Sequence, residues 1–244
     1  MNEPQRIAEY NRTTFSRDEY RRLLDVAYLD FHPALHAGDL APDFAVSDLD
    51  GRQVRLSDYR GKKHVAFELG CITAPVFVND IPEINRIYRR FRDKDVEFMI
   101  IYVREGHPAE RYTAHTSLEQ KTAYARELQR LEAIECPVLV DSLAGEVHHL
   151  YGLRPSPVWV VNKEGRIVHK SSWLVAQQFE MVLDSLLQAE QRAREQRRPR
   201  WVYSENWTEL GINPQVHERI LDRAGAKARH EVSQAFGQDP VRQG

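Results

Sequence analysis

The stretch FELGCITAPVF, residues 67–77, decides the fold class, because it reads as the end of a buried strand that runs directly into a helix. Residues 65–70 are apolar apart from Glu68, and a short apolar run of this kind is typical of a strand inside a sheet. Residues 76–91 have apolar side chains at positions 77, 81, 84, 87 and 91, which is the spacing of one helix face. The turn between them therefore lies at the carboxyl end of a strand and the amino end of a helix.

The pattern continues on both sides of this turn as alternating strands and helices. Such alternation predicts an α/β fold with helices packed on a central, partly parallel sheet, closed by an antiparallel hairpin. The other predicted strands are residues 44–46, 54–56, 96–103, 137–140, 158–161 and 166–169, and the other predicted helices are residues 117–133, 143–150 and 173–196.

Three segments are expected along the chain. Residues 1–36 form a helical N-terminal extension, residues 37–198 form the α/β domain, and residues 199–244 form a C-terminal extension. The last segment contains Trp201 and Tyr203, so we expect it to pack on the domain or on a partner subunit, which makes a homodimer possible.

Composition restricts the class of partner. The chain has 244 residues, 29% of them charged, and a net charge of -2, which provides no general attraction to nucleic acid or to anionic membranes. No apolar run approaches the roughly 20 residues that span a bilayer, and residues 1–15 lack the apolar centre of a secretory signal. We therefore expect a cytoplasmic protein without nucleic-acid or membrane partners. Its two cysteines, Cys71 and Cys136, are expected at opposite edges of the sheet, too far apart for a disulfide.

Two predicted strand ends contain reactive residue types. Ligands of open parallel sheets bind outside the carboxyl ends of the strands. One such end is residues 70–75, with Cys71, and the other is residues 104–108, with Glu105 and His107. The helix that follows Cys71 would point its positive end at the same place, which favours an anion and lowers a thiol pKa. The site is suited to a thiolate or a selenolate.

Glu68 stands inside the apolar strand that precedes the turn. An unpaired buried carboxylate is costly, so Glu68 is either paired or titrates with a raised pKa. A raised acid in a cleft is a candidate for proton transfer. The alternatives are a satisfied salt bridge and a strand face that is more exposed than the pattern indicates.

These features resemble the thioredoxin fold. The strand is followed by a turn with Pro75 and a helix with Pro82, eight residues after Ala74, and Glu68 lies six residues before Ala74 at the offset of the buried acid in that fold. The segment YGLRPSPVWVVNKEGRIV, residues 151–168, resembles the part of the fold that holds its cis-proline and hairpin. The resemblance implies that Pro155 is that cis-proline and faces the turn at Ala74.

Residues 38–190 resemble, more narrowly, the iodothyronine deiodinase family and its bacterial deiodinase-like relatives. The active-site turn of that family reads roughly G-S-C-T-U-P-P-F, with U for selenocysteine or, in many bacterial forms, cysteine, and Thr73, Pro75 and Phe77 match it. The family pattern V-Y-I-x-E-A-H is matched by IYVREGH, residues 101–107. The family's H-x-x-L element corresponds to HTSL, which begins at His115.

The resemblance implies thiol- or selenol-dependent reduction of a small organic substrate. A nucleophile at position 74 would attack the halogen of the substrate, an external thiol would serve as electron donor, and no cofactor or metal would be required. Glu105, His107 and His115 would handle protons, with Glu68 tuning the site. Residues assigned to the substrate side are Thr73, Pro75, Phe77, Arg154 and Pro155. Arg154 is also open to a role as a surface salt bridge.

The chain departs from the family at Ala74, because alanine cannot be the nucleophile. One interpretation is an inactivating substitution of a native cysteine or selenocysteine. A second is that Cys71 has taken over, although free cysteines are usually buried small apolar residues. A third is a non-redox enzyme or ligand-binding protein that uses Glu105 and His107 as acid and base. His107, His115 and Glu105 as metal ligands form a further alternative.

Overall fold

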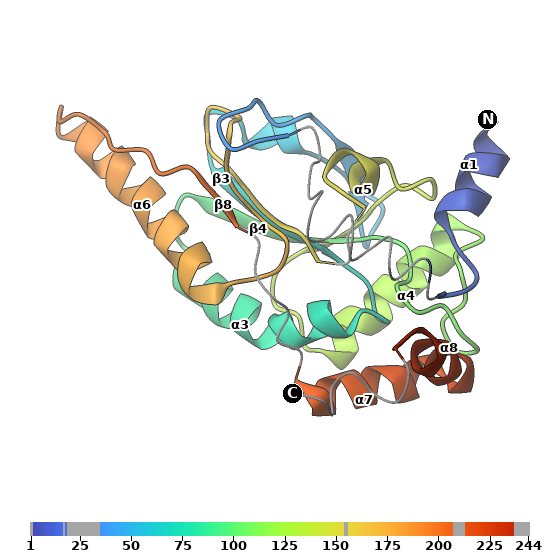
Figure 1. Ribbon diagram of the computed structural model, residues 1–244. Coiled ribbons are helices and arrows are strands. Elements are labelled where there is room, and N and C mark those ends of the chain that lie inside the picture. The colour runs from blue at the N-terminus through green and yellow to red at the C-terminus, as the bar shows by residue number, and fades with distance from the viewer. Residues whose placement is uncertain (1, 17, 19–34, 154–155, 207–212, 237–244) are drawn as a thin grey trace.

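The computed structural model describes residues 2–16, 18, 35–153, 156–206 and 213–236 (Figure 1). Half of the segment expected as an N-terminal helical extension, residues 1, 17 and 19–34, falls outside these residues. Arg154 and Pro155 also lie outside them, so the cis-proline and ligand predictions at these two positions stay predictions.

Within the described residues, one mixed sheet of eight strands runs in the order β2-β1-β5-β4-β3-β6-β7-β8. The central strands β3, β4 and β5 are parallel, while β6 and β7 form the expected antiparallel hairpin beside β3. At the other side β1 pairs antiparallel with β5 and β2. The strands are β1 (Ala45–Asp48), β2 (Gln53–Arg55), β3 (His64–Gly70), β4 (Val96–Tyr102), β5 (Val138–Val140), β6 (Val158–Val161), β7 (Ile167–Ser171) and β8 (Ser204–Asn206).

The helices follow the predicted positions within a few residues, and α1 lies in the N-terminal segment that was expected to be helical. The helices whose positions were not predicted are η1, α7 and α8. Pro82 lies inside α3 at its predicted place. The helices are α1 (Glu3–Tyr10), the 3-10 helix η1 (Leu56–Tyr59), α3 (Pro75–Phe91), α4 (Leu118–Leu131), α5 (Glu146–Leu150), α6 (Ala176–Arg194), α7 (Pro214–Ala224) and α8 (Ala226–Phe236).

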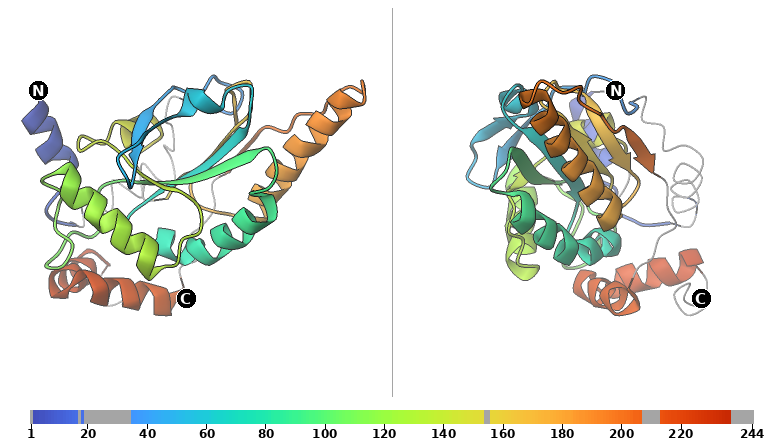
Figure 2. Two further views of the ribbon diagram at one scale, coloured as in Figure 1. Left: turned by 180° about the vertical axis from the view of Figure 1, so that it is seen from behind. Right: turned by 90° about the vertical axis from the view of Figure 1, so that its left-hand side faces the viewer.

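An apolar layer covers each face of the sheet. Figure 2 shows the helices that pack around the sheet. Alternate side chains of a strand point to opposite faces, so Ala66 of β3 packs with α3, α4 and α6, whereas Phe67 packs with η1 and α5. Both layers are buried, which explains why β3 and β4 read as nearly continuous apolar runs. Glu68 follows the parity of Ala66 and therefore faces the α3 layer.

The C-terminal extension contacts the domain through β8, which pairs parallel with β7, and through α7, which lies against α3 (Figure 1). A third apolar cluster joins the two ends of the chain, because Phe15 packs with Ala109 and with Leu221 and Val232 of the last two helices. In the described part of the chain, no helix is both long and apolar enough to cross a membrane.

Candidate active site

The turn between β3 and α3 is shaped by close packing beneath it. A side chain at Gly70 would place its Cβ 2.2 Å from the ring of Phe77, so glycine is required for that ring to pack against the strand end. Ala74 is the residue that caps α3, in an extended conformation, and its N–H donates to the carbonyl of Cys71 at 3.2 Å. The Ala74 side chain is only 2% exposed, so position 74 lies inside the protein at the positive end of a helix.

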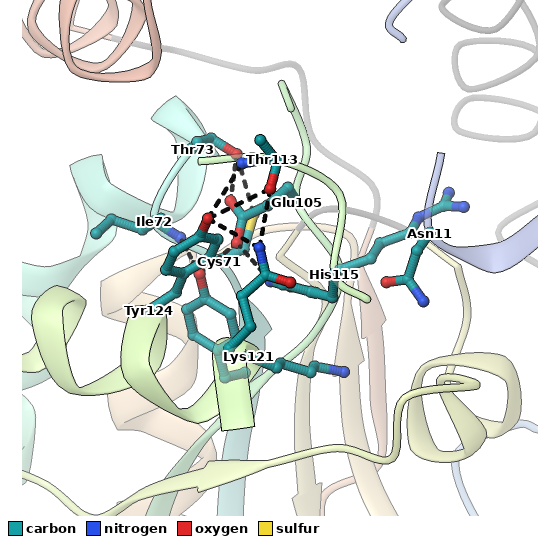
Figure 3. A network of polar contacts seen from close by, with 12 residues as sticks. Asn11, Cys71, Ile72, Thr73, Glu105, Thr113, His115, Lys121 and Tyr124 are labelled. Carbon is teal, nitrogen blue, oxygen red and sulfur yellow. Dashed lines mark hydrogen bonds and ion pairs between the residues drawn. The ribbon is translucent and has the colours of Figure 1, made fainter. Parts of the chain in front are cut away.

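Glu105 is the centre of a buried polar network directly beside this turn (Figure 3). The hydroxyl of Thr73 donates to Oε2 of Glu105 at 2.6 Å, and the hydroxyl of Tyr102 donates to Oε1. Nε2 of His115 lies 3.1 Å from Oε1, and neither side chain of that pair is exposed to solvent. Both carboxyl oxygens of Glu105 thus have hydrogen-bond partners within the protein.

The same network holds the turn to the loop after β4. The backbone N–H of His107 donates to the hydroxyl of Thr73 at 3.1 Å, and a Cβ built on Gly106 would lie 3.8 Å from the Cβ of Ala74. Parallel pairing of β3 with β4 brings the two strand ends together, as the sequence predicted. The predicted residues Thr73, Ala74 and Glu105 therefore meet at one edge of the sheet.

Cys71 is a buried thiol whose Sγ accepts the backbone N–H of Gly106 at 3.1 Å and lies 3.7 Å from the hydroxyl of Thr73. Burial, and then the negative charge of Glu105, raise the pKa of Cys71 far above its ordinary value. The thiol is therefore protonated at neutral pH, opposite to the depressed thiol pKa expected at this helix end. Cys136 precedes β5 at the opposite edge of the sheet, and both cysteines are free.

His107 and His115 occupy different places. The ring of His107 packs edge-on against Phe15, with centroids 4.5 Å apart, and its buried Nδ1 has no hydrogen-bond partner among the described residues. Burial, with a smaller contribution from His217, lowers the pKa of His107 to about 4, so its imidazole is neutral at pH 7. Of the three residues expected to handle protons, Glu105 and His115 are in direct contact.

Glu68 is 1% exposed, and neither of its carboxyl oxygens has a hydrogen-bond partner in the described part of the chain. Burial and the nearby carboxyl of Asp80 raise its pKa well above the ordinary value. Of the two outcomes expected for Glu68, a paired carboxylate or a carboxyl group with a raised pKa, the structure favours the second. Glu68 borders a cavity of about 10 Å³ beneath the strand, away from Ala74.

Sequence reasoning missed Tyr102 and Lys121. Tyr102 ends β4, and its hydroxyl joins Glu105 to the turn because it also accepts the N–H of Ile72 at 3.4 Å. Lys121 is fully buried in α4, and its ammonium donates to the carbonyl of Ser142 at 2.9 Å. Burial lowers the pKa of Lys121 to about 8. A signal was present, because Lys121 lies on the apolar stripe of its predicted helix.

Two cavities open at this edge of the sheet. The small one, about 80 Å³, is lined by Cys71, Ala74, Glu105 and His107 among others. The larger one is a cleft of about 750 Å³ between α1, β1 and α5, lined by Tyr10, Phe44 and several charged side chains. Pockets of this larger size accommodate small organic ligands. Among the described residues, no group of histidine, cysteine and acidic side chains is arranged to hold a metal ion.

The fold and the turn define the class of protein as thioredoxin-like. A thiol:disulfide interchange protein from Bacteroides sp. superposes with a TM-score of 0.52 at 15% identity, covering 67% of this chain and 97% of that one. An uncharacterized conserved protein from Geobacillus kaustophilus gives a TM-score of 0.50 at 19% identity, with 73% and 93% covered. At these identities the likeness concerns the fold alone.

The sequence profile of the iodothyronine deiodinase family matches residues 2–174, and the chain belongs to this family. A type I iodothyronine deiodinase from Xenopus laevis is 26% identical over 171 residues, which is 66% of this chain and 67% of that protein. A thyroxine 5-deiodinase from Sus scrofa is 31% identical over 153 residues, 58% of this chain. The chain spans about half the length of the thyroxine 5-deiodinases that it matches.

Proposed function

We propose that this architecture serves reduction of a small organohalogen compound by a thiol or selenol at position 74. The observation that supports the proposal is the Glu105 network, which places a carboxylate with Thr73, Tyr102 and His115 against the turn that caps α3. Family membership supplies the reaction type, and the positive end of α3 favours an anionic nucleophile at that position.

The proposed reaction balances with two equivalents of an external thiol. The thiolate or selenolate at position 74 attacks the halogen, the carbon–halogen bond breaks, and the carbon takes the electron pair and a proton. One external thiol then displaces halide from the enzyme's sulfur or selenium, and a second releases the enzyme as a disulfide forms. The net change is R–X plus two thiols to R–H, halide, a proton and a disulfide.

Proton delivery falls to Glu105 in this scheme. Glu105 is among the residues that line the small cavity with Ala74, and His115, 3.1 Å from its Oε1, provides a second titratable group. Thr73 and Tyr102 hold the carboxyl group in place. His107 lines the same cavity as a neutral imidazole, which suits hydrogen bonding to a polar substituent of the substrate.

The test replaces Ala74 by cysteine. We expect Ala74→Cys to release iodide from a panel of iodinated phenols in the presence of dithiothreitol, while the parent chain and Ala74→Ser, which lacks a thiol, release none. Adding Glu105→Gln to the cysteine variant should lower kcat on the order of a hundredfold or more. Adding Cys71→Ser should leave turnover in place. The proposal is overturned if neither Ala74→Cys nor a selenocysteine variant at the same position releases iodide.

A second candidate is a ligand-binding protein or non-redox enzyme, favoured by the departure from the family at the position of the nucleophile. Position 74 holds an alanine, and the neighbouring Cys71 thiol is buried and protonated. The unmodified chain is then expected to bind ligands in the cleft without turnover. A native gene that encodes alanine at this codon would favour this candidate, and one that encodes cysteine or selenocysteine would exclude it.

A further inference from the structure

Phe15 covers the small cavity beside position 74. Of the described residues that line this cavity, Phe15 is the one that comes from the N-terminal segment, and it is 7% exposed. Its ring packs edge-on against the imidazole of His107, with centroids 4.5 Å apart. The cavity measures about 80 Å³. Pockets that hold small organic ligands measure roughly 300–1,000 Å³, so a ligand of that kind reaches Ala74 only if a lining residue moves.

Phe15 also packs on the C-terminal helices α7 and α8, towards which the chain runs after α1 (Figure 1). Its apolar cluster is separate from the two layers that cover the sheet. The other members of the cluster are Ala109, Leu221, Ala224, Ala228, Val232 and Ala235. Four of these six side chains are alanines, which bury little apolar area, so the cluster adds less stability than either main layer. Local opening of a folded protein takes place in regions of this kind.

Two side chains of α8 hold the segment that contains Phe15. Oε2 of Glu231 accepts the backbone N–H of Phe15 at 2.9 Å, and the ammonium of Lys227 donates to the carbonyl of Thr13. Lys227 also lies 3.7 Å from Oε1 of Glu231, one helical turn away. Thr13 is exposed and the Lys227 side chain is 38% exposed, so water can replace the contact between them when the segment moves.

The supports on either side of this segment are fixed to the domain. Before it, the carbonyl of Tyr10 accepts Nη1 of Arg104 at 3.0 Å, and Arg104 is a half-buried residue that lines both the small cavity and the 750 Å³ cleft. Beneath it, Arg219 of α7 donates to both carboxylate oxygens of Glu132 at 2.7 and 3.1 Å. Movement of residues 12–15 between these supports would open the cavity without unfolding the sheet.

We propose that Phe15 is a lid over the small cavity, latched by Lys227 and Glu231 of α8, and that a reagent reaches position 74 only when residues 12–15 move away. The C-terminal extension thereby controls access to the site. Helices α7 and α8 lie outside residues 2–174, which match the family profile, so family membership does not imply this lid. The inference concerns access to the cavity and is independent of the chemistry proposed for position 74.

The test measures how fast iodoacetamide alkylates each cysteine of the folded chain at pH 8, with peptide mass spectrometry as the readout. Cys71 lines the cavity and reports its opening, whereas Cys136, buried at the opposite edge of the sheet, reports unfolding of the domain. Phe15→Ala removes the lid, so alkylation of Cys71 should be faster by about a hundredfold while that of Cys136 is unchanged. Phe15→Leu keeps an apolar side chain of similar size, and its increase should be roughly tenfold or less.

Lys227→Met tests the latch without changing a residue that lines the cavity. It removes the donor to the carbonyl of Thr13 and keeps the backbone N–H of Lys227, which donates to Glu110 at 3.0 Å. The loss of one hydrogen bond should speed the alkylation of Cys71 by about fivefold.

Arg229→Met is the matched control on the same helix. The ion pairs of Arg229 join α8 to Glu218 and Asp222 of α7 and do not involve residues 12–15. The rate for Cys71 should stay within about twofold of the parent protein. Three results would each overturn the proposal: an unchanged rate in Phe15→Ala, equal acceleration of Cys71 and Cys136 in that variant, or equal effects of Lys227→Met and Arg229→Met.

The urea dependence of alkylation in the parent protein is a measurement that needs no variant. Movement of a short segment exposes little surface, so the rate for Cys71 should rise with urea much less steeply than the rate for Cys136. Equal urea dependence of the two rates would show that Cys71 reacts only from the unfolded protein and would reject the lid. Alkylation of Ala74→Cys, with and without Phe15→Ala, should show the same acceleration at position 74 itself, and its absence would reject the lid as well.

Discussion

Two buried glutamates on neighbouring strand segments have opposite surroundings. Glu105, just beyond the end of β4, is 5% exposed and contacts Thr73, Tyr102 and His115 through both carboxyl oxygens. Glu68, inside β3, is 1% exposed and has no hydrogen-bond partner for either oxygen in the described part of the chain. Similar burial thus produces a fully hydrogen-bonded carboxylate in one place and an isolated carboxyl group in the other.

The contrast shows that hydrogen-bond partners, rather than the depth of burial, determine what a buried acid contributes to stability. Removing Glu105 leaves three polar side chains without their acceptor, and each orphaned buried group is costly. Among the described residues, removing Glu68 leaves no polar group without a hydrogen-bond partner. It also removes a carboxyl group whose pKa is raised well above its ordinary value by burial. The two glutamates should therefore respond in opposite directions to the same substitution.

The largest expected effect on stability is that of the substitution Glu105→Leu. This change keeps most of the side-chain volume but leaves the donors of Thr73, Tyr102 and His115 unsatisfied, so the free energy of unfolding should fall by about 3–5 kcal/mol. Urea denaturation at pH 8 would measure it. Stability within about 1 kcal/mol of the parent protein would contradict the assignment of Glu105 as the centre of the network.

The next effect concerns Asp80, the carboxyl group that neighbours Glu68. Burial raises its pKa from 3.8 to about 7. Between these values the folded state binds more protons than the unfolded state, so the parent protein loses stability as pH rises from 3.8 to 7. Each pH unit between the two pKa values corresponds to about 1.4 kcal/mol, which makes the full loss at most about 4 kcal/mol.

Asp80→Asn should remove this loss, because an amide does not ionise and still accepts the backbone N–H of Leu174. Denaturation curves at pH 4, 5.5 and 8 would show a flatter pH dependence for the variant, with its gain greatest at pH 8. An unchanged slope would mean that Asp80 is solvated well enough to ionise normally in the folded protein. Asn79→Ala, which removes a neighbouring donor, serves as control.

Glu68→Leu is the direct counterpart of the first substitution. Because burial raises the pKa of Glu68 well above its ordinary value, the folded protein loses stability as pH rises from the ordinary pKa towards the raised one. Leucine does not ionise and has no such dependence. The variant should gain about 1–3 kcal/mol at pH 8 and less at pH 4, as measured by denaturation. A loss at pH 8 comparable to that of Glu105→Leu would break the comparison between the two acids.

The smallest effect is expected for Tyr102→Phe, which removes one of the three contacts to Glu105 and the acceptor for the N–H of Ile72. The free energy of unfolding should fall by about 1 kcal/mol, which is typical of a single hydrogen bond. Tyr124→Phe is a suitable control, because its hydroxyl contacts the partly exposed side chains of Thr113 and Gln120. That control should stay within about 0.5 kcal/mol of the parent protein.

Most of the fold followed from sequence patterns because they reflect local geometry. The apolar runs at β3 and β4, the helix spacing of α3 and the antiparallel hairpin of β6 and β7 lie within a few residues of their predicted positions. The short strand β8 was not predicted, because Ser204–Asn206 has no apolar pattern and becomes a strand only through pairing with β7.

The site was predicted only in part. Thr73, Ala74 and Glu105 were found because they sit at the ends of two predicted parallel strands, and strand order alone brings such ends together. The contact between Glu105 and His115 was not predicted, because His107 and His115 both follow Glu105 closely in sequence and only the path of the loop decides which ring approaches it. Arg104 can be read from the sequence, but the two cavities that it lines cannot.

The sequence by itself determined the thioredoxin-like order of elements, the deiodinase-type turn and the alanine within it, because these depend on residue type and spacing along one chain. Only the tertiary structure decided which acid is hydrogen-bonded and which is isolated, that the Cys71 thiol is protonated, and that a half-buried arginine stands between two cavities. Those properties depend on burial and on partners distant in sequence, such as Tyr10 for Arg104 and His115 for Glu105. Charge states in a protein interior follow from such neighbours, and neighbours are set by packing.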